Sequence, residues 1–267
     1  MSDRVLLDIR DDVAYVTFNR PDKYNGLDRE MMLAMVDTAK KIKKDRSIRA
    51  VILQGEGKAF CAGLDFASWS KTPAKLAAAF LKPRPGTTNL VQEVAWCWRK
   101  LSIPVIAVTR GHCFGGGIQI ALAADFRFTT PDCEFSIMEI KWGMIPDMTG
   151  TIPLRELTSM DVAKELTMTG RIFKGNEAMA LGLVTGVSDD PLKDAEELVA
   201  AIKTRSPDGV SAAKALFHKT WSASESSALG TESIIQAKVL AGKNQRIVTK
   251  ANFAKKLPKF ITRQFDY

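Results

Sequence analysis

Three consecutive glycines, Gly115 to Gly117, lie between an apolar β-rich run and an apolar helical run. Residues 105–108 are VIAV and residues 120–124 are IALAA, so the glycines are predicted to join a strand to a helix. The first N–H groups of a helix have no partner within that helix, and glycine lets a ligand approach the backbone closely. The segment therefore predicts a main-chain site for an anion, or for a carbonyl oxygen that becomes negative during a reaction.

The first half of the chain alternates short strands with helices. β-Rich runs occupy residues 14–18, 50–53, 103–108 and 126–128. Between the first two runs, Asp28 can cap a helix that carries an apolar stripe of methionine and aliphatic residues. This alternation favours an α/β fold with a buried parallel sheet.

Helices replace strands in the second half. Residues 191–205, 207–221 and 224–256 are predicted as successive helices, and prolines stand at favourable starting positions. A boundary is expected near residues 204–208, which divides the chain into a core of residues 1–204 and a helical region of residues 205–267.

Residues 66–88 differ from the rest of the first half, because they contain a Thr72-Pro73 break and the run KPRPG at 82–86. A mobile lid or pocket-lining segment is one interpretation, and a plain surface insertion is the other.

Composition narrows the class of protein. A chain of 267 residues with 46% hydrophobic and 25% charged residues is ordinary for a soluble globular protein. No apolar run approaches the roughly 20 residues of a membrane span, and the N-terminus lacks a secretory pattern, so we expect a cytoplasmic protein without a membrane partner. The four cysteines show no metal-like spacing and there are only two histidines, so we expect buried free thiols and no metal site.

The net charge of +8 is uneven, since residues 243–263 hold seven lysines and arginines and no acidic residue. Such a run suits phosphates on a nucleotide-bearing cofactor, on RNA or on lipid, and a solvated helix face is the alternative.

A second glycine loop, GKAFCAGLDF at 57–66, follows the run at 50–53. Together with the triple glycine it offers main-chain donors from two separate strand ends, which is a common way to build an oxyanion hole.

Five segments follow one another along the chain: FNRP at 18–21 with NGL at 25–27, FCAGLD at 60–65, GHCFGGG at 111–117, residues 170–184 (from GR to LGLV), and FAKKLPKF at 253–260. In this order they resemble motifs of the crotonase superfamily, also called the enoyl-CoA hydratase/isomerase family, and the resemblance covers nearly the whole chain. The resemblance implies a spiral of β-β-α repeats, followed by a C-terminal helical region that packs between subunits in a homotrimer or homohexamer.

The resemblance also implies an acyl-CoA substrate. The thioester carbonyl would accept hydrogen bonds from the backbone N–H groups of Leu64 and Gly116. Coenzyme A would be part of the substrate and not a permanently bound cofactor. Some relatives bind RNA, but Glu139 and the two glycine loops argue against a nucleic-acid partner here. The CoA contacts implied are Tyr24, Gly26, Leu27, Ala62, Lys255 and Lys256.

Acid and base groups decide the reaction. Glu139 lies in the largely apolar run SIMEIKWGMIPD at 136–147, so we expect a raised pKa, although a solvated loop residue is the alternative. Glu139 matches the catalytic glutamate that hydratases and many isomerases of the family share. The other hydratase carboxylate would fall at Gln119, which can hold water or a carbonyl but cannot take a proton near neutral pH.

Asp147 supplies a second carboxylate, eight residues after Glu139, as in the dienoyl-CoA isomerase branch of the family. Gly143 and Pro146 favour a bent loop between them, so the two could flank an acyl chain; alternatively, Asp147 caps the next helix. A double-bond shift with Glu139 and Asp147 as acid/base groups therefore fits somewhat better than hydration. A 2-enoyl-CoA hydratase, a thioester hydrolase and an RNA-binding protein with little catalysis remain open.

Four other residues carry weaker predictions. His112 is expected to pack within its loop and Asp65 to fix its loop, whereas Trp69 and Trp142 could line the acyl pocket or belong to the core.

Overall fold

The structure is a computed structural model that describes residues 3–84 and 86–267. Pro85, within the predicted 66–88 segment, and the first two residues of the N-terminus lie outside the described residues.

The larger of two sheets contains the four β-rich runs that the sequence predicts. Its strands lie in the order β1-β2-β3-β5-β7-β10, antiparallel between β1 and β2 and parallel across the rest. The strands are β1 (Val5–Arg10), β2 (Val13–Phe18), β3 (Ala50–Gly55), β5 (Val105–Thr109), β7 (Phe126–Thr129) and β10 (Gly186–Val187). The predicted parallel sheet is thus confirmed, with an antiparallel strand at one edge.

The smaller sheet consists of β4 (Ala59–Cys61), β6 (His112–Phe114), β8 (Glu134–Ser136) and β9 (Phe173–Lys174), in that order. Within the described residues, the chain passes from the larger sheet to the smaller one three times, from β3 to β4, from β5 to β6 and from β7 to β8, and a helical segment follows each pass. This is the spiral of β-β-α repeats that the resemblance implies. It also changes one expectation: the triple glycine follows the short strand β6 and not the apolar run at 105–108 directly.

Helices cover both faces of the larger sheet. On one face, α1 (Arg29–Lys44), α4 (Leu90–Arg99) and α5 (Gly116–Ala123) enclose the main apolar core. On the other face, α9 (Pro191–Lys203) packs on every second residue of the central strands, those that point away from the main core. Asp28 caps α1 as predicted, because its side chain accepts a hydrogen bond from the backbone N–H of Met31 at 2.7 Å. Both faces being buried explains why the central strands are continuously apolar.

The predicted 66–88 segment contains α2 (Phe66–Trp69) and α3 (Pro73–Phe80). Trp69 is a core residue, since it is buried and donates its indole N–H to the carbonyl oxygen of Leu27 at 2.8 Å. Two short helices, α6 (Thr151–Leu157) and α7 (Met160–Thr169), lie between β8 and β9, and a third, α8 (Gly175–Ala180), follows β9.

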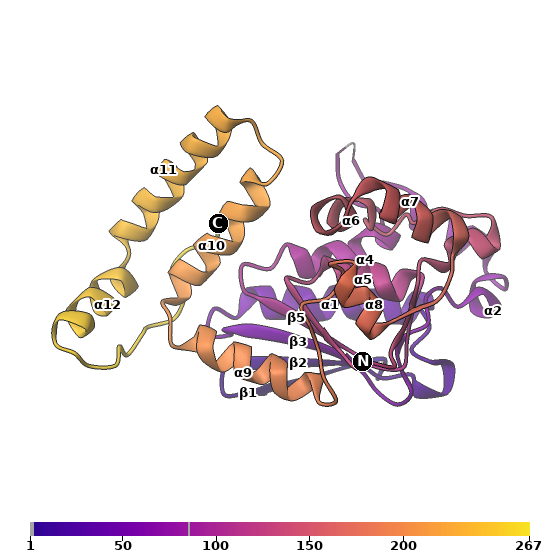
Figure 1. Cartoon of the computed structure of the whole chain (residues 1–267), viewed down its shortest axis with the longest axis horizontal. Helices are drawn as coiled ribbons and strands as arrows, with labels where there is room; N and C mark the ends of the chain where they lie inside the picture. The colour runs from indigo at the N-terminus through magenta and orange to yellow at the C-terminus, as the bar shows by residue number, and fades with distance from the viewer. Residues whose placement is uncertain (1–2, 85) are drawn as a thin grey trace.

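The C-terminal helices α10 (Pro207–Thr220), α11 (Glu225–Ala241) and α12 (Lys243–Phe253) extend to one side of the sheets (Figure 1). The prediction of one helix over residues 224–256 is wrong, because Gly242 has an extended backbone that ends α11. Contacts with distant residues fix the start of the next helix, α12. Gln264, near the C-terminus, accepts a hydrogen bond from the N–H of Lys243 at 2.6 Å, and buried Asn244 donates to Asp208 at 2.8 Å. Across residues 3–84 and 86–267, the helices are all too short or too polar to cross a membrane.

Candidate active site

The triple glycine lies at the N-terminus of α5, where each glycine is required by its surroundings. Gly115 is the N-cap and has φ +52°, a backbone conformation that side chains disfavour. A Cβ at Gly117 would lie 2.1 Å from the carbonyl oxygen of Cys61, and one at Gly116 would lie 2.6 Å from the sulfur of Met148. The glycines therefore let α5 approach the neighbouring strand end and the loop of Met148.

The second glycine loop lies directly beside the first. Leu27 donates its N–H to the carbonyl of Gly63 at 2.8 Å, and a Cβ at Gly63 would lie only 3.3 Å from the nitrogen of Gly116. In the described part of the chain, the N–H groups of Leu64 and Gly116 have no hydrogen-bond acceptor. The two adjacent loops thus each carry an unpaired main-chain donor.

A buried network fixes the second loop. Asp65 accepts hydrogen bonds from the hydroxyl of Ser68 at 2.6 Å and from Arg20 at 2.7 Å. Burial by itself would raise the pKa of Asp65, but these bonds outweigh it and lower the pKa. Asn25, with φ +55°, donates to the carbonyl of Ala59 at 2.8 Å. Asp65 thus holds its loop, as expected. Arg20 and Asn25 also anchor this region, through contacts that the sequence alone did not reveal.

Glu139 lies on the 3-10 turn η2 (Met138–Trp142) and is only 7% exposed. Its Oε1 accepts a hydrogen bond from the amide of Gln119 at 2.6 Å and lies 3.5 Å from the position of a Cβ on Gly115. Its Oε2 is buried and has no hydrogen-bond partner among the described residues. Burial raises the pKa of Glu139, while hydrogen bonds from its own N–H and from Gln119 partly offset that shift. The expected raised pKa is confirmed, and the alternative of a solvated loop residue is wrong.

Asp147 lies in the loop between η2 and α6 and is half-buried. Burial raises its pKa, and its negative charge in turn raises the pKa of Glu139, so the two carboxyl groups lie within electrostatic range of each other. The predicted bend is present, since Gly143 has φ +69°. The N-cap of α6 is Gly150, so the alternative that Asp147 caps this helix is wrong.

Gln119 connects the two segments that carry these carboxyl groups. Its side chain is 1% exposed, and its Oε1 accepts hydrogen bonds from the N–H groups of Met148 at 2.9 Å and Gly150 at 3.0 Å. The sequence predicts that this amide can hold water or a carbonyl. In the structure, its oxygen bonds to backbone N–H groups and its amino group bonds to Glu139.

Four of the predicted CoA contacts lie together beside Leu64. Ala62 donates its N–H to the carbonyl of Tyr24 at 2.9 Å, and Leu27 forms a β-bridge with Leu64. A Cβ at Gly26 would lie 3.6 Å from that of Asp65.

Lys255 and Lys256 are different, because they follow the end of α12. Figure 1 shows α12 at the opposite end of the molecule from α2, which directly follows Leu64 and Asp65. A single chain therefore does not bring these lysines to the other predicted contacts.

The remaining candidate residues contact other side chains of the protein. His112 lies 3.1 Å from Glu134 and packs its ring against Tyr24 and Phe114, as expected for a loop-packing residue. Trp142 is 60% exposed and stacks on Phe66 with ring centroids 4.2 Å apart. The four cysteines are buried and free, as predicted. Over the described ranges, no cluster of three or more His, Cys, Asp or Glu side chains is arranged to hold a metal ion.

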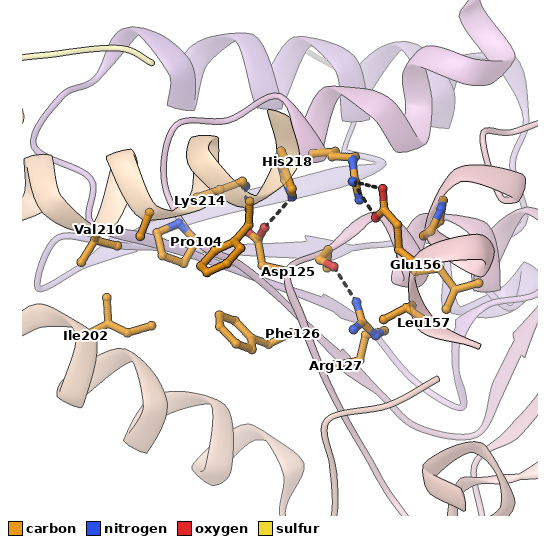
Figure 2. Close-up of a pocket in the computed structure, with 16 residues that line it drawn as sticks. Pro104, Asp125, Phe126, Arg127, Glu156, Leu157, Ile202, Val210, Lys214 and His218 are labelled. Carbon is orange, nitrogen blue, oxygen red and sulfur yellow. Dashed lines mark hydrogen bonds and ion pairs between the residues drawn. The ribbon is translucent and has the colours of Figure 1, made fainter. Parts of the chain in front are cut away.

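A cavity of about 420 Å³ lies elsewhere, between α10, α6 and the ends of the larger sheet (Figure 2). Its charged groups are engaged with one another: Lys214 pairs with Asp125 at 2.7 Å, and Arg99 pairs with Glu156 at 2.7 Å. Burial, with a contribution from nearby cations, lowers the pKa of His218 to about 4, so this ring is neutral at pH 7. These pairs join α10 and α6 to the core, and we do not place the reaction there.

Comparison with known proteins agrees with this geometry. Residues 8–262 match the sequence model of the enoyl-CoA hydratase/isomerase family. The (E)-benzylidenesuccinyl-CoA hydratase of Thauera aromatica is 33% identical over 184 residues, which covers 68% of this chain and 69% of that protein. The mitochondrial Delta(3,5)-Delta(2,4)-dienoyl-CoA isomerase of Rattus norvegicus is 33% identical over 221 residues, which covers 76% of this chain and 64% of that protein.

Among solved structures, an enoyl-CoA hydratase from Bacillus anthracis superposes with a TM-score of 0.88 at 25% identity, covering 97% of this chain and 99% of that one. Of the two curated relatives named above, one is a hydratase and the other an isomerase, and their identity to this chain is equal.

Proposed function

The chain belongs to the enoyl-CoA hydratase/isomerase family and is an enzyme, and within this family we propose that it shifts a carbon–carbon double bond in an enoyl-CoA or dienoyl-CoA thioester. The observation that carries the proposal is the pair of carboxyl groups, Glu139 and Asp147, whose pKa values are both raised by burial. Gln119, at the remaining candidate position, cannot exchange a proton near neutral pH.

The thioester carbonyl oxygen accepts hydrogen bonds from the N–H groups of Leu64 and Gly116. When the substrate loses a proton, the electron pair of the broken C–H bond delocalises onto this oxygen as an enolate. Each donor is already in place before the charge develops, and such a donor supplies about 3–4 kcal/mol of transition-state stabilisation. This role is supported because both N–H groups are unpaired and lie in adjacent loops.

Glu139 and Asp147 move the protons. Oε2 of Glu139 takes the proton from substrate carbon, because Oε1 is occupied by Gln119. Protonated Asp147 then delivers its proton to a carbon further along the acyl chain, so the double bond moves and the composition of the substrate stays the same. Proton exchange between the two carboxyl groups and solvent resets the enzyme.

The CoA portion of the substrate lies against Tyr24, Gly26, Leu27 and Ala62, which surround the second glycine loop. Lys255 and Lys256 bind CoA phosphates of a neighbouring subunit, since their own chain holds them at the opposite end of the molecule. This requires a homo-oligomer, a trimer or a hexamer, in which residues 205–267 make the contacts between subunits and residues 1–204 carry substrate and catalysis.

Hydration is the second candidate function. The unpartnered Oε2 of Glu139 is a place where a water molecule can be held, with Asp147 as the opposing base. In that reaction water adds across the double bond and no bond shift follows.

An assay of purified protein with 3,5-dienoyl-CoA and crotonyl-CoA in parallel separates these reactions. The expected result is a change in the dienoyl absorbance with little loss of crotonyl-CoA. Rapid hydration of crotonyl-CoA without a dienoyl shift would overturn the isomerase assignment in favour of the hydratase. Release of free CoA from either substrate would indicate a thioester hydrolase instead, and salt-sensitive RNA binding without CoA affinity would indicate a binding protein.

A further inference from the structure

We propose that Gln119 is a positioning residue that leaves one oxygen of Glu139 free for proton transfer and joins Glu139 to the segment carrying Asp147. The proposal rests on the proposed function, because it concerns the same two carboxyl groups.

The orientation of the Gln119 amide is set by its partners. The N–H groups of Met148 and Gly150 both point at one end of the amide, which must therefore be the carbonyl oxygen. The amino end then faces Glu139 and donates to it at 2.6 Å. A flip of the amide would set its amino group against the N–H groups of Met148 and Gly150, and its oxygen against Oε1 of Glu139. All three bonds would be lost, so the side chain has one stable orientation.

This orientation makes the two oxygens of Glu139 unequal. Oε1 accepts from Gln119, whereas Oε2 has no hydrogen-bond partner among the described residues and lies beside the N-terminus of α5. A buried carboxylate oxygen without a partner is costly, and such atoms are retained where a ligand or a proton completes them. Oε2 is thus the oxygen that exchanges the substrate proton.

The same side chain fixes the segment that follows Asp147. Met148 and Gly150 are both held by Gln119, and a Cβ at Gly150 would lie only 2.7 Å from the Gln119 oxygen. The side chain of Met148 in turn packs against Gly116. Gln119 therefore sets the separation of Glu139 and Asp147 through bonds on both sides, and it keeps Met148 against the glycine that donates to the thioester.

An uncharged residue suits this place. Gln119 donates to ionised Glu139 and so opposes the effect of burial on its pKa, without adding a second charge to the buried site. A hydrophobic residue of the same length would fill the space but provide none of the three hydrogen bonds.

The test compares Gln119→Met, Gln119→Glu and Glu139→Gln with the unmodified enzyme, by steady-state kinetics across pH. Gln119→Met keeps the volume and removes all three bonds. We expect kcat to fall by about 100-fold with KM nearly unchanged, because a small misplacement of a catalytic group has this effect. The kinetic pKa of Glu139 should also rise, since its donor is lost.

Gln119→Glu keeps the acceptor for Met148 and Gly150, and its protonated form can still donate to Glu139. We expect it to recover much of the lost activity at acidic pH and to lose it as pH rises and the two carboxylates repel each other. A residue that only fills space would show neither this pH-dependent rescue nor a shifted kinetic pKa.

The outcomes separate the two proposals. If Glu139→Gln abolishes activity but Gln119→Met retains the normal kcat and pH profile, the positioning role is wrong and the proposed function stands. If Glu139→Gln retains full activity, the proposed function itself is wrong, whatever Gln119 does.

Discussion

Gly63 leaves no room for a side chain between itself and Gly116: a Cβ on Gly63 would lie 3.3 Å from the backbone nitrogen of Gly116 and 2.9 Å from the carbonyl oxygen of Phe114. This close approach sets the separation of the two free N–H groups, because Leu64 directly follows Gly63. The spacing of the donors thus depends on a residue without a side chain.

Gly63→Ala should therefore damage both stability and catalysis. Its φ of +87° is unfavourable for alanine and the added methyl group pushes the loops apart. We expect a loss of unfolding free energy of more than about 1 kcal/mol and a fall in kcat/KM, measured by urea denaturation and steady-state kinetics. Gly86→Ala is the matched control, since Gly86 has φ +78° and nothing within 4 Å. Equal effects of the two substitutions on kcat/KM would contradict the role of the contact.

Glu139→Gln should lose activity and gain stability at neutral pH. We expect kcat to fall by about 10²–10⁴-fold, the usual contribution of a positioned acid or base. Because burial raises the pKa of Glu139 above its value in the unfolded chain, stability from its neutral form is present below the unfolded pKa and is lost as pH rises through the folded pKa. The melting temperature of the variant should exceed that of the unmodified protein at pH 8, and the two should converge near pH 4. A constant difference across this range would show that ionisation of Glu139 does not affect folding.

Asp147→Asn should separate the two proton transfers. Glu139 can still remove the substrate proton, so exchange of that proton with deuterium from D₂O should continue. Delivery to the second carbon loses its acid, and isomerisation should fall by about 100-fold or more. NMR of the recovered thioester measures the exchange, and absorbance measures the shift. Loss of both together would mean that Asp147 does not act as the separate second acid.

Lys214→Met should destabilise the fold without affecting the site. The side chain of Lys214 is 7% exposed, pairs with Asp125 at 2.7 Å and donates to the carbonyl of Ile103 at 2.9 Å, so its removal deprives the largely buried Asp125 of its lysine partner. We expect a loss of about 3–5 kcal/mol in urea unfolding, with kcat of the folded enzyme unchanged. Lys193→Met removes an exposed pair with Glu197 at 3.9 Å and should leave the midpoint unchanged. An unchanged midpoint for Lys214→Met would show that the pair does not hold α10 in place.

Complementation between subunits tests the placement of Lys255 and Lys256. A double alanine variant at these positions should raise KM for acyl-CoA in a salt-dependent way and leave kcat nearly unchanged. When its subunits are mixed with Glu139→Gln subunits, some sites receive an intact Glu139 from one chain and intact lysines from the neighbour, so a fraction with normal KM should reappear. A mixture that shows only the raised KM would place the lysines within their own chain's site.

Much of the fold could be predicted because its signals are local. The cap at Asp28, the stripe of buried methionines on α1 and the apolar runs of the larger sheet depend on residues a few positions apart. The single helix predicted over residues 224–256 failed for the opposite reason. The helix that follows Gly242 is held by Gln264, a residue 21 positions from Lys243, and no periodicity within the segment records that bond.

The candidate site divides in the same way. The sequence by itself determined the two glycine loops and the two candidate carboxyl groups, Glu139 and Asp147. Glycine content, apolar surroundings and motif order can all be read directly from the order of residues. Only the tertiary structure decided that Gln119 holds Glu139 and the segment after Asp147, through partners 20, 29 and 31 residues away. A side-chain amide has the same chemistry in any fold, and its role depends on which donors and acceptors the docking of α5 against residues 138–150 brings within about 3 Å of it.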